Sequence, residues 1–286
     1  MLIDHPLPDT DAWVLSLAGA ELPVLRHTVE AFDKLRTQAE SVNVRSLSGI
    51  ILQDPLMTLR VFAHLAQHRR KTQLTDITTI EQGLLMIGIG PFFHHFDKLL
   101  RVEEHLKSRP KALLGLLKTV NRSRRAAHWA RDWAIHRYDL NVDEITLAAL
   151  LHDVADILMW CFAPELASRV EERKSAEPHM RSATAQVETY GITMLELQQA
   201  LVRYWGLPQL LTMLMDHSNA NNPRVRTVAL AVDLARHSAN GWNDAALPDD
   251  LRAIQELLRI SDDMLPQKLG VDADHILPLL APSNPA

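Results

Sequence analysis

The chain has 286 residues, of which 47% are hydrophobic and 23% charged, and its formal net charge is -5. This composition is typical of a soluble globular protein of one or two domains. The weak negative charge disfavours binding to nucleic acid or to anionic membranes, because both need a concentrated positive field. No long uncharged apolar stretch and no secretory leader are evident, so a cytoplasmic location is expected. The single cysteine, Cys161, excludes a disulfide framework and favours an inert buried thiol.

Helix start signals recur along the chain, whereas alternating runs of β-branched residues are scarce, so the sequence predicts an all-α fold. Asp54-Pro55 places a capping acceptor before a first-turn proline. Thr78 with Glu81 predicts a capping box at the start of the next helix. Further helix starts are predicted at Asn141, at Thr193 with Glu196, and at Asn222 before Pro223.

Polar connectors suggest how the helices are grouped. The segment 107–111, KSRPK, is the better boundary between two lobes. We therefore expect an N-terminal segment (1–14), an N-terminal helical lobe (15–111), a second helical lobe (112–240), and a C-terminal helical extension with a frayed tail (241–286).

The most informative segment is LAALLHDVADILMW, residues 147–160. A helix here would be apolar nearly all round and therefore buried. Its only strongly polar side chains are those of His152, Asp153 and Asp156. In a continuous helix, at about 100° per residue, these three side chains converge on one flank. Since buried charges need a partner or a metal, that flank is the candidate functional site.

Two more residues complete a candidate metal site. His128 lies in HWARDWA and Asp233 interrupts TVALAVDLA, each inside an apolar helical pattern. Neutral imidazole and carboxylate groups are suitable ligands for divalent Fe, Mn, Zn or Ni. His128, His152, Asp153 and Asp233 are therefore the candidate ligands. Each also has a structural alternative, because a core histidine is usually hydrogen-bonded and a helical aspartate usually pairs with a nearby Arg or His. No other cofactor is expected.

The order of motifs resembles that of a known family. LLHDVADILMW resembles the signature of HD-domain proteins. With IILQDPLMTLRVFAHLA, ITTIEQGLLMIGIGPF and YWGLPQLLTMLMDHS, the stretch from about 22 to 240 resembles the HD-related output domain (HDOD) family. The resemblance implies a two-lobed helical fold with a degenerate HD-type bundle in the second lobe. It also implies a bacterial signalling module that is related to HD phosphohydrolases but generally acts as a regulatory output rather than as an enzyme.

The chain departs from the HD enzymes at informative places. Asp156 stands where HD phosphodiesterases commonly have a lysine, and a carboxylate there would repel phosphate. Met194 occupies a place where HDOD sequences usually have a histidine, and Asp216-His217 replaces a frequent histidine pair. We therefore assign no catalytic residue and expect Asp156, Asp216 and His217 to be structural or site-lining. Asp156 also lies four residues after His152 and can pair with a protonated imidazole.

The leading hypothesis is a non-catalytic signal-transduction protein that binds a protein partner in a groove between its two lobes. The alternative is a metal-dependent HD-type phosphohydrolase that acts on a nucleotide or phosphodiester, with the metal activating a bound water. Binding of a cyclic dinucleotide is disfavoured, because few basic residues lie near the proposed site. The sequence names neither the partner nor the input signal.

Overall fold

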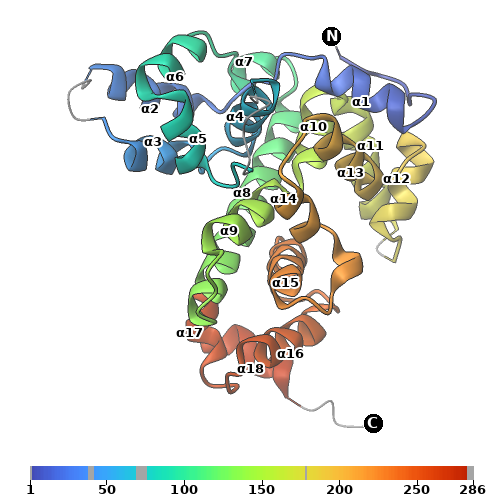
Figure 1. Ribbon diagram of the computed structural model, residues 1–286. Coiled ribbons are helices and arrows are strands. Elements are labelled where there is room, and N and C mark those ends of the chain that lie inside the picture. The colour runs from blue at the N-terminus through green and yellow to red at the C-terminus, as the bar shows by residue number, and fades with distance from the viewer. Residues whose placement is uncertain (1, 38–41, 69–75, 178, 282–286) are drawn as a thin grey trace. The chain divides into compact units, whose positions relative to one another are not determined.

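The computed structural model describes residues 2–37, 42–68, 76–177 and 179–281. These residues form helices joined by turns and contain no strand beyond one isolated bridge between Val24 and Arg101, so the predicted all-α fold is confirmed (Figure 1). The chain divides into two compact units. Unit 1 comprises residues 1–121 and 151–212, and unit 2 comprises residues 122–150 and 213–286.

Unit 1 holds most of the helices. They are α1 (Thr10–Ala18), α2 (Arg26–Thr37), α3 (Val44–Ile51), α4 (Pro55–Gln67), α5 (Ile80–Ile87), α6 (Ile89–His95), α7 (Val102–His105), the first part of α8 (Pro110–His136), α10 (Val154–Phe162), α11 (Pro164–Ala176), α12 (Ser182–Tyr190), α13 (Met194–Tyr204) and most of α14 (Gln209–Leu214).

Unit 2 is built from the second part of α8 and from helices nearer the C-terminus. These are most of α9 (Val142–Leu151), the short 3₁₀ helix η2 (His217–Asn219), α15 (Pro223–His237), α16 (Leu247–Leu258), α17 (Leu265–Leu269) and α18 (Ala273–Leu280).

Local capping sets many helix starts as predicted. Thr193 and Glu196 form the expected capping box at α13, and the Asn222 side chain accepts a hydrogen bond from a backbone N–H in the first turn of α15. The box predicted at Thr78 was wrong by one residue. Thr79 is the cap and accepts from the Gln82 N–H, while the Gln82 side chain accepts from the Thr78 N–H. The physical reason is that Gln82, three residues after Thr79, carries an amide long enough to reach back past the cap.

Asp54 does more than cap a helix. It is fully buried, and its carboxylate accepts from the N–H groups of Leu56 and Met57 at the start of α4. The same carboxylate accepts from the Leu25 N–H and the Thr28 hydroxyl, both at 2.8 Å. Burial raises the pKa of Asp54, while these hydrogen bonds act in the opposite direction. Asp54 therefore joins the starts of α2 and α4 inside unit 1.

The two compact units divide the chain differently from the expected lobes. Helix α8 runs from Pro110 to His136 without a break, and residues 151–212 group with the N-terminal helices. The lobe boundaries inferred from the sequence stay a prediction. Residues 282–286, at the end of the expected frayed tail, lie outside the described residues.

One described segment, Val142–Phe162, could cross a membrane if only its length and its apolar composition are considered. Within its most apolar window, 72% of the residues are buried inside the structure. Cys161 is among its buried residues, as expected, and burial raises the pKa of its thiol far above the ordinary value. Such extensive burial inside the protein is typical of a helical segment in the core of a folded domain.

Candidate functional site

The HD dipeptide lies in a break between two helices. The sequence predicts one helix over 147–160, and this prediction was wrong. Helix α9 ends at Leu151, α10 begins at Val154, and His152 and Asp153 form the turn between them. A constant rotation of 100° per residue therefore does not describe these side chains, because the helix is interrupted where His152 and Asp153 lie.

Gln198 of α13 accounts for the break. In a continuous helix, the Ala155 N–H would donate to the Leu151 carbonyl oxygen. Here the buried Gln198 amide is inserted between them: its Nε2 donates to the Leu151 oxygen and its Oε1 accepts from the Ala155 N–H, both at 2.9 Å. A side chain inserted into the backbone ladder is a recognised cause of helix interruption. Our sequence analysis missed Gln198, because its partners lie more than forty positions away.

The side chains of the turn pair with each other. His152 Nδ1 lies 3.0 Å from Asp153 Oδ1, and the two side chains are 14% and 15% exposed. They are thus largely covered but still accessible from solvent. Asp156 lies in the first turn of α10 and is half-buried. Its carboxylate adds to the effect of burial in raising the pKa of Tyr190.

The other two candidate ligands belong to unit 2. His128 is exposed on α8, while its apolar neighbours, such as Trp129 and Trp133, are buried, as the predicted core-facing helix requires. Asp233 on α15 forms an ion pair with Arg236, one turn away, which is the structural alternative considered for a helical aspartate. Each unit thus contributes two of the four residues, and whether all four share one metal stays a prediction.

The described residues of either unit do not by themselves form a cluster of metal ligands. Among the described residues of each unit, no three His, Cys, Asp or Glu side chains gather closely enough to hold a metal ion. His152 and Asp153 have suitable donor atoms, but a protein metal centre commonly uses three or more protein ligands. The pair in unit 1 therefore does not fit a metal without further ligands.

Asp216 and His217 lie at the start of η2 in unit 2. Asp216 Oδ1 accepts from the Ser218 N–H at 3.0 Å, and this hydrogen bond lowers the pKa of Asp216. His217 is the first residue of η2 and is half-buried. The Asp216 carboxylate thus caps the start of η2.

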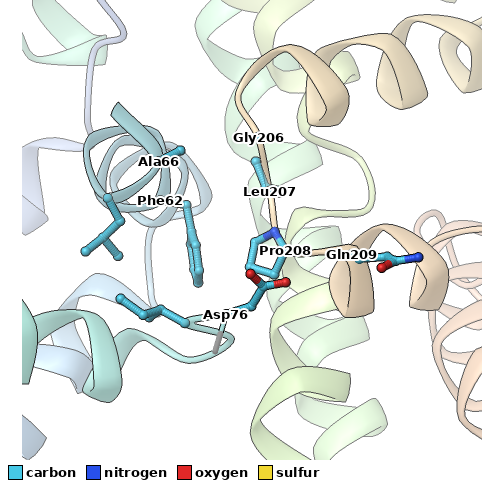
Figure 2. Close-up of a pocket in the computed structure, with 9 residues that line it drawn as sticks. Phe62, Ala66, Asp76, Gly206, Leu207, Pro208 and Gln209 are labelled. Atoms are coloured by element: carbon cyan, nitrogen blue, oxygen red, sulfur yellow. The ribbon is translucent and has the colours of Figure 1, made fainter. Parts of the chain in front are cut away.

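Unit 1 also holds a pocket that sequence reasoning did not identify. Its volume is about 390 Å³. Figure 2 shows Phe62 and Ala66 on α4 facing the segment 206–209, with the Asp76 carboxylate close to Pro208. Gly206 has φ +62°, and a Cβ there would lie 3.4 Å from the Ala66 Cβ. The lining residues are Phe62, Leu65, Ala66, Asp76, Ile77, Gly206, Leu207, Pro208 and Gln209.

Two solved structures share the fold over nearly the whole chain. A virulence factor from Campylobacter jejuni is 20% identical with a TM-score of 0.65, and the match covers 97% of this chain and 98% of that one. The MmoQ response regulator from Methylococcus capsulatus is 19% identical with a TM-score of 0.59, and the match covers 92% and 98%. At these identities the likeness establishes the fold alone.

No curated protein matches the chain. The HDOD domain family, in contrast, matches residues 22–221, which is well over half of the sequence and includes the His152-Asp153 turn, Gln198 and the pocket of unit 1. The chain therefore belongs to the HDOD family of signalling proteins, which are related to the HD phosphohydrolases.

Proposed function

We propose that this protein is a non-catalytic regulatory component of a signalling pathway and that it acts by binding another protein. The observation that carries the proposal is the chemistry of the HD turn. His152 and Asp153 hydrogen-bond to each other, and Asp156 takes the place of the lysine that HD phosphodiesterases commonly use. Two like charges about 4 Å apart cost roughly 4 kcal/mol at an effective dielectric constant near 20. A carboxylate at that place therefore opposes a phosphate substrate.

The pocket of unit 1 is the proposed contact for the partner. It lies between residues of the two lobes expected from the sequence, since 62–77 belong to the first lobe and 206–209 to the second. Its lining is apolar and polar in nearly equal parts, with apolar side chains such as Phe62 and Leu65 and the Asp76 carboxylate at the edge. Protein interfaces often depend on one or two apolar side chains that fill such a pocket. We expect the partner to insert a side chain of this kind.

The first experiment tests the absence of catalysis. Wild-type protein and Asp153→Ala are purified without chelator, and their content of iron, manganese, zinc and nickel is measured. Hydrolysis of bis(p-nitrophenyl) phosphate is then assayed with each metal added. We expect less than stoichiometric metal and the same background hydrolysis in both proteins. Stoichiometric metal together with turnover, both lost in Asp153→Ala, would establish the metal-dependent phosphohydrolase instead.

The second experiment tests the contact with a partner. A photo-crosslinking amino acid replaces Ala66 in the pocket or, as the control, Leu85, which is exposed on α5 outside the pocket. After irradiation in the native cell, we expect a defined protein adduct from position 66 that position 85 does not give. Adducts that are absent from both positions, or equal at both, would contradict a partner site in this pocket.

A further inference from the structure

A second pocket lies wholly within unit 2 and differs in character from the first. Its volume is about 740 Å³, within the range of sites that hold small molecules. It is formed by the end of α8, the turn before α15, and the end of α16. The lining residues are His136, Arg137, Tyr138, Ala220, Asn221, Pro223, Arg226, Glu256, Leu257, Leu258 and Arg259.

The pocket gathers positive charge in a chain whose formal net charge is -5. Arg137, Arg226 and Arg259 line it, against the single carboxylate of Glu256. Arg226 pairs with Glu256, which lowers the pKa of that carboxyl group. Among the described residues, no ion pair involves Arg137 or Arg259. Within the described part of the chain, these two guanidinium groups therefore line the pocket without an ion-paired carboxylate, and guanidinium binds phosphate through paired hydrogen bonds.

Hydrogen bonds hold the walls of this pocket in place. His136 Nε2 donates to the Leu258 carbonyl oxygen at 3.1 Å and ties the end of α8 to the end of α16. Arg224 Nε donates to Asp139 Oδ2 at 2.9 Å and ties the turn after α8 to the start of α15. The arginine side chains thus project from a framework that is already formed, which reduces the ordering cost of binding.

Two lining residues have an unusual backbone. Tyr138 has φ +56° and Arg259 has φ +55°, and they are the only described residues other than glycine with positive φ. Glycine adopts this left-handed conformation without steric cost, whereas tyrosine and arginine do not. The Tyr138 side chain is also 92% exposed, so packing in the core does not explain its aromatic ring. Both conformations are those of a helix C-cap: the Asp139 N–H donates to the Ala134 oxygen at the end of α8, and the Arg259 N–H donates to the Gln255 oxygen at the end of α16. The exposed Tyr138 ring, rather than the backbone, is therefore the feature that suits a ligand.

We propose that this pocket binds a nucleoside 5′-di- or triphosphate. Adjacent phosphate groups can accept hydrogen bonds from the guanidinium groups that line the same pocket, and the exposed Tyr138 ring offers a face on which a base can stack. Of the two rings that line the pocket, the His136 ring is hydrogen-bonded to the Leu258 carbonyl oxygen, which leaves Tyr138 for stacking. One stacking residue suits a mononucleotide better than a ligand with two separated bases. The site is distinct from the HD turn, and no hydrolysis is part of the proposal.

The variants are chosen so that they still fold. Arg259→Gly and Tyr138→Gly place glycine where the backbone is already left-handed, so each removes a side chain without adding strain. Arg252→Gln is the matched control. Arg252 lies on α16, which Arg259 caps, and it is exposed and does not line the pocket. Binding of ADP to the full chain is measured by isothermal titration calorimetry, with thermal melts to verify folding.

We expect saturable binding of ADP, weaker binding of pyrophosphate, and none of adenosine. Arg259→Gly and Arg137→Gln should each weaken ADP binding about tenfold or more, since each removes a charge-assisted hydrogen-bond donor. Tyr138→Gly should weaken ADP binding but leave pyrophosphate binding unchanged, and Arg252→Gln should match the wild type. The proposal is overturned if millimolar ADP gives no saturable heat, or if the pocket variants bind ADP as the wild type does.

Glu256→Gln distinguishes phosphate binding by Arg226 from a purely structural role of the Arg226–Glu256 ion pair. The change removes the carboxylate that competes with phosphate for Arg226, so ADP binding should become several-fold tighter. Weaker binding would contradict the proposed position of the phosphates. An oligoglutamate peptide is titrated in parallel. If the peptide binds and ADP does not, the pocket recognises an acidic protein segment, and the nucleotide proposal is wrong.

Discussion

The two units accommodate their most deeply placed carboxylates in different ways. In unit 1, Asp54 is fully buried, and its carboxylate accepts hydrogen bonds from neutral backbone N–H groups and a hydroxyl group. In unit 2, Asp139 and Asp250 are each 13% exposed and pair with a side chain that can carry positive charge, Arg224 and His237. Neutral donors must be positioned accurately by the backbone, whereas a pair with histidine depends on the state of protonation. Substitution of Asp54 should therefore cost more stability than substitution of a residue in these pairs, and the His237–Asp250 pair should depend on pH.

The largest effect is expected at Asp54. Asp54→Ala removes the acceptor of several buried donors, and each unsatisfied donor costs about 1–3 kcal/mol, so we expect a loss of about 3–5 kcal/mol in the free energy of unfolding. Asp33→Ala on α2, which removes a surface ion pair with Arg36, is the control and should cost less than about 1 kcal/mol. Urea unfolding, followed by hydrogen exchange in α2 and α4, measures both. Equal losses in the two variants would show that the buried Asp54 network contributes no more to stability than a surface ion pair of the same unit.

The next effect is expected at Gln198. Gln198→Leu leaves the Leu151 carbonyl and the Ala155 N–H without the amide that bridges them, and we expect a loss of about 1–3 kcal/mol. Gln199→Leu, the neighbouring residue on α13, is the control. Hydrogen exchange at the start of α10 should become faster in Gln198→Leu alone. Unchanged stability with slower exchange there would mean that α9 and α10 join into one continuous helix when the amide is removed.

His64 gives unit 1 a pH dependence of its own. Its ring lies 3.8 Å from the ring of His95 and 4.1 Å from that of His68, measured between centroids. Burial, followed by the proximity of these two histidines, lowers the pKa of His64 to about 4 from 6.5. Between pH 6.5 and about 4 the unfolded chain binds a proton that the folded chain does not. The stability of unit 1 should therefore fall as the pH falls through this window.

Nuclear magnetic resonance titration of the His64 ring and unfolding at several pH values check this prediction. His64→Gln should give a shallower dependence of stability on pH between 6.5 and 4 than the wild type. His94→Gln, an exposed neighbour of His95 on α6, is the control and should keep the wild-type dependence. A His64 pKa at or above 6.5 would show that the ring cluster does not disfavour protonation.

The smallest effect is expected at His237 and has the opposite sign. Its hydrogen bond to Asp250 raises the pKa of His237 above 6.5, against the effect of burial. The folded chain then holds a proton that the unfolded chain has lost. This contribution to stability is fully present below pH 6.5 and disappears as the pH rises through the raised pKa. His237→Gln should destabilise unit 2 at pH 6 but less at pH 8.5, whereas the exposed His275→Gln should have no effect at either pH. Equal destabilisation by His237→Gln at both values would contradict this account.

Much of the fold follows from local signals in the sequence. The caps at Asp54, Thr193 and Asn222 lie where they were predicted, because a capping side chain bonds to backbone groups two or three residues away. The all-α fold and the HDOD family follow from the same local patterns and from the order of the motifs. Thr78 and Thr79 are both suitable N-cap residues for α5, and the sequence pattern predicted Thr78, whereas Thr79 is the cap.

The candidate site depended much more on tertiary structure. The sequence by itself determined that His152 and Asp153 lie in a mostly buried apolar segment, because hydrophobic periodicity reports burial. Only the tertiary structure decided that the segment breaks there, since the interrupting amide belongs to Gln198 on another helix. The pocket between α4 and residues 206–209 and the arginine-lined pocket of unit 2 likewise join distant parts of the chain. Local patterns fix caps and helix faces, whereas contacts between distant residues exist only after the helices have packed.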